Sequence, residues 1–529
     1  MYAIPRKRTA NIIYYTHTRN NSGKFGKIFF LYRKMRKIRD IILQNSDCCR
    51  KTSPIFCNNA GNQGKSSEIR RRHRNPGQFF CDDDTRSTIF VPFQKNHIAM
   101  KSVFLLALAL TALSMKPARS QERFEVFPTK TESDIPYRIP AIAALPDGTV
   151  ICLADYRHSR NDIGMKEDGR VDLRMRISPD NGCSWGEIRT LISGKGAESK
   201  DFMNVAFGDP CIVADQRTGR VLVMSCAGNV SFPKGSRDHH QCIARFYSDD
   251  GGQTWDGPVD IAEGIYEQFD KESPVKAMFI ASGKILQSRY VRKGQYSRLY
   301  CAVMAKGEDG SNRNYVLYSD DFGQSWDVLG GTHRAPIPQN ADEAKVEELP
   351  GGAVLISSRT EGGGRIFNIY RFDNKRRATG RWGSPVHSSA YNNGIVTKDN
   401  ACNGGLMLVP AVCVEDGRNV DVLLQSAPLG PGRTNVGIYY KVLESRNDYS
   451  SVESIAGDWD GVYRVTDKPS AYSTMALQSD GSIGFLFEEQ THCTSRGGGY
   501  TIVYDNLSVE EITGGRYSVL KNGVFKDKR

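Results

Sequence analysis

Two short acidic stretches carry the carboxyl groups best suited to acid–base chemistry. They hold Asp162, Asp168 and Asp172 in the first stretch and Glu343, Glu347 and Glu348 in the second. A carboxyl group can protonate a leaving oxygen, or accept a proton from a nucleophile, when its surroundings adjust its pKa. Acidic residues near a strand end usually face solvent instead, so residue type alone leaves a catalytic and a surface interpretation open.

The sequence contains no recognisable metal-binding motif. Of the 13 cysteines, nine lie between Cys152 and Cys493, without a C-x-x-C pair or a histidine spacing suited to zinc. The pair His239-His240 is more simply an exposed loop than a ligand set. An odd number of cysteines leaves at least one thiol free, and a chain of this length can bury a core without disulfides. We therefore expect no metal and no cofactor.

The elements that must position catalytic side chains are predicted to be strands. Short apolar runs rich in β-branched residues follow turns that contain glycine, as at Val150–Ala154, Val221–Ser225 and Val354–Ser357. No segment shows the apolar period of a helix of three turns. This pattern predicts an all-β protein.

An eight-residue motif, S-x-D-x-G-x-[S/T]-W, occurs three times at intervals of 70 and 71 residues, as Ser178–Trp185, Ser248–Trp255 and Ser319–Trp326. In a hairpin turn the Asp side chain can accept backbone N–H bonds, Gly can supply a positive φ, and Trp can pack the turn onto the sheet. The motif is therefore interpreted as structural. Residues 121–529 hold about six such intervals, which predicts a six-bladed β-propeller with these Asp-box hairpin turns.

The formal net charge of +12 is concentrated before residue 100. Residues 1–99 contain 20 Lys and Arg against 6 Asp and Glu, whereas residues 100–529 contain 51 against 53. The main body lacks the overall positive charge of a polyanion-binding protein, and we expect no nucleic-acid partner. Residues 1–99 show no lasting apolar period and are interpreted as mistranslated upstream sequence or a disordered basic extension.

A secretory signal peptide is predicted at residues 100–120. Met100-Lys101 precedes the apolar run Ser102–Leu113, and a segment of the small-x-small type follows it. The run is too short to span a bilayer as a finished helix, so we expect no transmembrane anchor. With Met100 as the true start, the exported chain begins near Gln121, and residues 121–529 form a periplasmic, surface-displayed or secreted catalytic domain.

Together with the sequence YRIP at Tyr137–Pro140, the three boxes make the body resemble the bacterial sialidases, the exo-α-neuraminidases of glycoside hydrolase family 33. The resemblance covers Phe124–Leu507 and rests on several motifs in the family's order. It implies hydrolysis of terminal sialic acids from glycoproteins, glycolipids and oligosaccharides, with sialylated glycoconjugates as partners. We expect a monomer.

The resemblance implies that three arginines from different blades converge on the carboxylate of sialic acid. They are Arg138 in the R-I-P motif, Arg359 after the strand at 354–357, and Arg433 after a Ser-x-Pro segment. The planar, permanently charged guanidinium group suits this task. A single arginine is most simply a surface charge, but three in matching motif context favour the binding role.

The resemblance places the general acid/base at Asp162, on a loop, with Asp168 and Asp172 as rivals on the same stretch. A carboxyl group that protonates a leaving oxygen needs a raised pKa, which closure of an apolar loop could supply. Arg157 matches the family's further arginine near O4 of the sugar. Asp209, in a Gly-Asp-Pro sequence, is either a sugar contact or a turn former.

The implied nucleophile is Tyr472, because a carboxylate that attacked beside the carboxylate of the substrate would suffer like-charge repulsion. A tyrosine stays neutral until a neighbouring glutamate takes its proton. The resemblance makes Glu343 that partner, with the two later glutamates of its stretch as alternatives. Glu488 matches the glutamate that orients the first arginine, and Glu489 is its alternative.

The implied reaction is hydrolysis with retained configuration through a sialyl-tyrosine intermediate. A trans-sialidase has the same residues but passes the sugar to an acceptor. A non-catalytic sialoglycan-binding propeller should lack at least one of them. Since all are present, the sequence favours the hydrolase.

Overall fold

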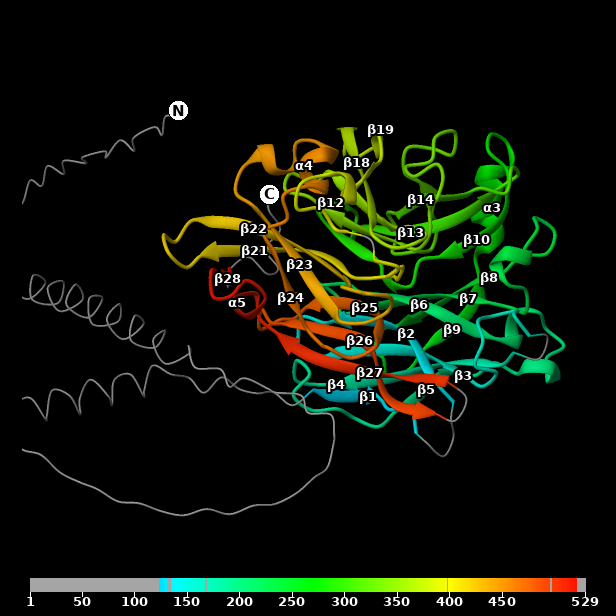
Figure 1. Ribbon diagram of the computed structural model, residues 1–529. Helices are drawn as coiled ribbons and strands as arrows, with labels where there is room; N and C mark the ends of the chain where they lie inside the picture. The colour runs from blue at the N-terminus through cyan, green and yellow to red at the C-terminus, as the bar shows by residue number, and fades with distance from the viewer. Residues whose placement is uncertain (1–122, 131–134, 167–168, 397, 495–496, 521–529) are drawn as a thin grey trace, which may run out of the picture. The chain divides into compact units, whose positions relative to one another are not determined.

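A computed structural model describes residues 123–520 apart from 131–134, 167–168, 397 and 495–496. These residues belong to one compact unit and form six sheets with few and short helices; the strand pairs are antiparallel except for β11 with β6. Figure 1 shows the sheets following one another along the chain, from cyan to red. The arrangement confirms the predicted six-bladed β-propeller. The predicted extension and signal peptide, residues 1–99 and 100–120, lie outside the described residues.

The first three blades run from residue 137 to residue 328. Blade 1 contains β2 (Tyr137–Ala144), β3 (Val150–Arg157), β4 (Val171–Ser178) and β5 (Arg189–Ile192). Blade 2 contains β6 (Phe207–Ala214), β7 (Val221–Ala227), β8 (Cys242–Ser248) and β9 (Asp256–Asp260), with β11 (Gly283–Lys284) beside β6. Blade 3 contains β10 (Val275–Ile280), β12 (Leu286–Lys293), β13 (Tyr296–Gly307), β14 (Asn312–Ser319) and β15 (Asp327–Val328).

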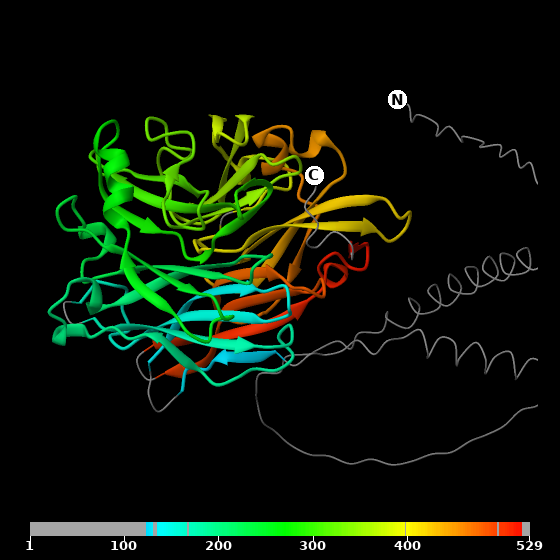
Figure 2. The same ribbon diagram turned by 180° about the vertical axis from the view of Figure 1, so that it is seen from behind.

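The last three blades complete the ring. Blade 4 contains β16 (Ala344–Glu348), β17 (Val354–Arg359), β18 (Arg365–Asn374), β19 (Thr379–Trp382) and β20 (Val386–His387). Blade 5 contains β21 (Leu406–Cys413), β22 (Asn419–Pro428), β23 (Val436–Leu443), β24 (Gly461–Arg464) and β28 (Tyr517–Val519). Blade 6 contains β25 (Ser470–Leu477), β26 (Ile483–Thr494), β27 (Gly497–Leu507) and β1 (Phe124–Phe127). The hairpin of β21 and β22, yellow in Figures 1 and 2, projects beyond the strands around it.

The described helices are three α-helices and five 3-10 turns. The α-helices are α3 (Ala262–Asp270), α4 (Val452–Ala456) and α5 (Val509–Ile512). The 3-10 turns are η2 (Gly196–Glu198), η3 (Met203–Val205), η4 (Phe232–Lys234), η5 (Ser388–Ala390) and η6 (Arg446–Tyr449). None of these helices has the length and apolar character needed to cross a membrane.

The ring is closed by strands from both ends of the described chain. β1 pairs antiparallel with β27, with Phe124 opposite Tyr504, so the first strand is the outer strand of the last blade (Figure 1). Phe124 also stacks on Trp185 of the first Asp box, with 5.8 Å between the ring centroids. The first and last blades are therefore joined by hydrogen bonds and by aromatic packing.

The three Asp boxes are hairpin turns, as predicted, and each joins the last two strands of its blade. In the third box Asp321 accepts hydrogen bonds from the Ser325 amide at 2.9 Å and from the Ser319 hydroxyl at 2.8 Å. Gly323 has a φ of 83°, and Trp326 is buried. Replacing this turn would therefore remove several bonds at once.

We expect Asp321→Ala to lower the free energy of unfolding by about 1–3 kcal/mol, because the turn amides lose their acceptor. Gln324→Ala is the matched control, since that exposed side chain lies in the same turn. Chemical denaturation of both variants checks this. Equal stability of the two would contradict a structural role for the box.

The first strands of five blades, β2, β6, β16, β21 and β25, lie together near the axis of the ring, and their starts meet at one end. β2 contacts β6 and β25, and β21 contacts β16 and β25. Arg138 is the second residue of β2, Tyr472 is the third of β25, and Glu343 directly precedes β16. Later residues of the same strands line a cavity of about 350 Å³ at the opposite end. The topology thus gathers residues from distant parts of the sequence at the strand starts.

Candidate active site

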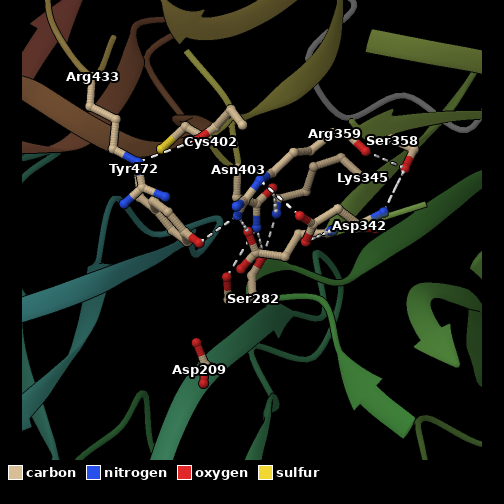
Figure 3. Close-up of polar contacts among 12 residues, drawn as sticks. Asp209, Ser282, Asp342, Lys345, Ser358, Arg359, Cys402, Asn403, Arg433 and Tyr472 are labelled. Atoms are coloured by element: carbon tan, nitrogen blue, oxygen red, sulfur yellow. Dashed lines mark hydrogen bonds and ion pairs between the residues drawn. The ribbon is translucent and has the colours of Figure 1, made fainter. Parts of the chain in front are cut away.

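Three arginines surround the ring of Tyr472. The guanidinium carbons of Arg138, Arg359 and Arg433 lie 5.5, 6.0 and 5.6 Å from the centroid of that ring. Arg138 comes from β2, Arg359 ends β17, and Arg433 lies between β22 and β23. Figure 3 shows Arg359 and Arg433 directed toward Tyr472. Four different blades therefore contribute to one cluster of positive charge around a phenol.

Glu488 fixes two members of this cluster. Its buried carboxylate accepts hydrogen bonds from Arg138 Nε at 2.7 Å and from the amides of Ile139 at 2.8 Å and Tyr472 at 3.2 Å. Ile139 has a φ of 55°, which is rare for a β-branched residue and turns its amide toward the carboxylate. The alternative, Glu489, binds Thr466 and Lys468 instead and does not contact Arg138.

The Tyr472 hydroxyl and the Glu343 carboxylate share one nitrogen. Arg359 Nη1 donates to the Tyr472 hydroxyl at 2.8 Å and to Glu343 Oε2 at 2.5 Å, while Arg359 Nε pairs with Asp342 at 3.1 Å. Burial and the nearby charge of Glu343 raise the pKa of Tyr472 well above its usual value. The phenol is therefore neutral in this state, with a carboxylate close by to accept its proton.

The alternatives to Glu343 lie elsewhere. Glu347 bonds Lys284 at 2.6 Å, and Glu348 accepts a bond from the Ser288 hydroxyl at 2.5 Å, farther along β16. Both are buried rather than solvent-facing. Of the three glutamates in this stretch, only Glu343 touches the cluster around Tyr472.

Asp162 is 68% exposed and forms a hydrogen-bonded ion pair with Arg157. The charge of Arg157 lowers the pKa of Asp162, and partial burial of the carboxyl group opposes that shift. The raised pKa expected of a general acid is therefore absent in this state, because the loop leaves the carboxylate open and paired. Release of this pair is required before Asp162 can hold a proton near neutral pH.

Of the two rivals of Asp162, Asp172 has a different set of partners. Asp172 is fully buried and binds His158 at 3.0 Å and Arg174 at 2.9 Å, which makes it a structural anchor within blade 1. Asp168 lies outside the described residues.

Asp209 lies within β6, where its φ of 55° belongs to a register shift between Gly208 and Cys211 rather than to a turn. Its amide donates to Asp155 Oδ1 at 2.9 Å, and the sugar contact stays a prediction. Its carboxylate is buried, 3.9 Å from Arg157 Nη2, and burial together with the charge of Asp155 raises the pKa of Asp209 well above its usual value. Figure 3 shows Asp209 apart from the Tyr472 cluster, so it borders the Arg157 side of the site.

Two carboxylates of the site, buried Asp155 and half-buried Asp342, are absent from the sequence-based predictions. Asp155 pairs with Arg157 at 2.8 Å, and burial raises the pKa of Asp155 to about 6. Asp342 supports Arg359 from the other side. Asp155 and Arg157 are two residues apart in one strand and share a face, a spacing that sequence can reveal. Among the described residues, no group of three potential metal ligands was found.

Known proteins are similar to this chain in sequence and in fold. The BNR repeat-like domain family matches residues 163–484, more than half of the chain. The sialidase of Micromonospora viridifaciens is 25% identical over 421 residues, which cover 73% of this chain and 58% of that protein. The chain thus spans less than two thirds of the length of that relative.

Solved structures agree in fold. Hadza microbial sialidase Hz136 superposes with a TM-score of 0.55 at 21% identity, covering 74% of this chain and 69% of that one. The intramolecular trans-sialidase from Ruminococcus gnavus gives a TM-score of 0.53 at 18% identity, covering 71% of this chain and 95% of that one. The chain belongs to the BNR repeat-like domain family, and it is similar in sequence and in fold to bacterial sialidases of the glycoside hydrolase family 33 type.

Proposed function

We propose that this protein is a retaining exo-α-sialidase that releases terminal sialic acids from glycoconjugates through a sialyl-tyrosine intermediate. One observation carries the proposal: a neutral tyrosine shares Arg359 with a glutamate and lies among three arginines from three blades. The named relative is a sialidase, which supports the activity at the level of the family.

The arginines offer donors for an anionic sugar. Arg138 bonds protein only through Nε, and Arg433 only through Nε to the Ala401 carbonyl at 3.3 Å, among the described residues. The terminal nitrogens of both therefore remain available on the side of Tyr472. A carboxylate can accept parallel N–H bonds from such planar groups, which fixes its orientation as well as its charge. We assign Arg138, Arg359 and Arg433 to the substrate carboxylate.

The chemistry follows from the charge of the substrate. A carboxylate nucleophile would be repelled by the carboxylate on the anomeric carbon, whereas neutral Tyr472 is not. As the Tyr472 oxygen bonds to the anomeric carbon, its proton passes to Glu343 and the glycosidic bond breaks. Asp162, released from Arg157, gives its proton to the leaving oxygen. Water, deprotonated by Asp162, then attacks the same carbon, and Tyr472 leaves as the proton returns from Glu343.

Release of sialic acid from a fluorogenic α-sialoside tests this proposal directly. A hydrolase frees sialic acid and the fluorophore in equal amounts. Fluorophore without an equal yield of free sialic acid would indicate transfer to another acceptor, as in a trans-sialidase. Binding without any release would contradict the proposal and favour a sialoglycan-binding propeller.

We expect Asp162→Asn to slow substrates according to their leaving groups. With a natural sugar as leaving group, kcat/KM should fall by about 10²–10³-fold, because the amide cannot donate the required proton. An aryl sialoside with an acidic phenol as its leaving group depends less on that proton. The factor by which its kcat/KM falls should therefore be at least ten times smaller. Asp238→Asn, on the exposed loop between β7 and β8, is the control. Equal losses on both substrates would contradict the role of Asp162.

We also propose that residues 121–529 form the catalytic domain and that the segment 100–120 exports it. The proposal of export rests on the apolar run Ser102–Leu113 and the basic residue that precedes it. Amino-terminal sequencing of the exported protein checks this, and a terminus far from Gln121 would contradict it.

A further inference from the structure

One ionisable column follows the inner strand of blade 4. Side chains of a strand alternate between its two faces, so Glu343, Lys345 and Glu347 share one face at the start and along β16. Their contacts agree: Glu343 reaches Arg359 in the candidate site, and Glu347 reaches Lys284 beside the cavity at the opposite end. Lys345 lies between these two layers, directly below the site.

Lys345 is buried without a carboxylate in bonding contact among the described residues. Its ammonium group donates to the Ser282 carbonyl and, at 2.7 Å, to Asn403 Oδ1. Figure 3 shows Lys345, Asn403 and Ser282 together beneath Arg359. Gly283 of β11 closes the remaining side, since a Cβ there would lie 3.2 Å from Lys345 Cε. The ammonium group therefore sits in a tight, neutral cradle.

The charged and titratable groups that face Lys345 come from four strands or strand starts. They are Glu343 before β16, Arg365 of β18, Cys211 of β6 and Cys301 of β13. Glu343 is the only anion among them. Burial lowers the pKa of Lys345 to about 7, and the charge of Glu343 opposes that shift. The side chain consequently loses its charge close to neutral pH.

A positive charge below Glu343 matters because the guanidinium group of Arg359 already has several partners. Arg359 contacts Glu343, Asp342 and Tyr472, and the proposed function adds the carboxylate of the substrate to its partners. Binding an anionic sugar then places another negative charge beside Glu343. In a buried setting that repulsion is costly unless a second positive charge offsets it.

We propose that Lys345 is a positioning residue of this site, whose positive charge offsets that of Glu343 from below and strengthens binding of the anionic sugar. The inference rests on the proposed function. It assigns no contact with the substrate to Lys345, and it predicts that binding weakens as Lys345 loses its proton.

The test compares KM for a fluorogenic sialoside between pH 6 and pH 8.5 in the full-length protein, Lys345→Gln and Lys441→Gln. Wild-type KM should rise about fivefold across this range as Lys345 becomes neutral. The Lys345→Gln variant should have a KM near the high value at pH 6 and converge with the wild type at pH 8.5. Lys441 is also buried and bonds carbonyl groups, but in β23 away from the site, so Lys441→Gln should follow the wild type.

Two other results would overturn the inference, and a third would contradict the proposed function. A KM that differs between Lys345→Gln and wild type by the same factor at every pH indicates a merely structural role and overturns the inference. A pH-independent KM in the wild type overturns it as well, even if Lys345→Gln does not fold. A wild-type protein without sialidase activity contradicts the proposed function instead.

Discussion

Replacing Tyr472 with phenylalanine is expected to lower kcat for sialoside hydrolysis by at least about 10³-fold. Phenylalanine keeps the ring that lies among the three arginines but removes the oxygen that would bond to the anomeric carbon. Binding of a sialic acid analogue should therefore change by less than about tenfold. Turnover and equilibrium binding, measured on the same preparation, separate these two effects.

The control for this variant is Tyr500→Phe. Tyr500 also lies against Arg138, with the guanidinium carbon 5.1 Å from its ring centroid, but it has no link to Glu343 or Arg359. Its hydroxyl should be dispensable for turnover. If Tyr472→Phe retained more than a tenth of the wild-type kcat, Tyr472 would not be the nucleophile.

Glu343→Gln is expected to reduce kcat by about 10²–10³-fold, because the amide cannot take the proton of Tyr472. The amide oxygen can still accept a hydrogen bond from Arg359, so the arginine should stay in place and KM should change little. Steady-state kinetics with the fluorogenic sialoside give both quantities.

Glu347→Gln is the matched control for the loss of a buried glutamate. Glu347 lies on the same strand face and is paired with Lys284 at 2.6 Å and Arg289 at 2.8 Å, yet it is distant from Tyr472. This change should cost stability without a comparable loss of kcat. Similar kinetic losses in the two variants would point to a shared structural cause and against Glu343 as the base.

The sequence predicted the fold because its repeats are local. Each Asp box forms its turn from residues at most seven positions apart, so Asp321 and Trp326 carry their own signal. Ring closure could not be predicted in this way. The pairing of Phe124 with Tyr504 joins the two ends of the described chain, and no local sequence pattern predicts it.

The candidate site could be predicted only through a resemblance, since its members are spread from Arg138 to Glu488 and meet at strand starts. The contacts among these side chains could not be predicted from the sequence. The pairing of Asp162 with Arg157, which lowers the pKa of Asp162, depends on the loop conformation. The depth of Lys345 depends on how blades 2, 3 and 5 close around it, through Ser282 and Asn403.

Covalent trapping tests the central claim, that Tyr472 bonds to the sugar. A sialosyl fluoride with a second fluorine at carbon 3 has a good leaving group, while the added fluorine opposes positive charge at the anomeric carbon and slows hydrolysis of the intermediate. Intact mass spectrometry should show one added sugar, and peptide mapping should place it on Tyr472. An adduct on any other residue, or inactivation of the protein without an adduct, would contradict the sialyl-tyrosine mechanism.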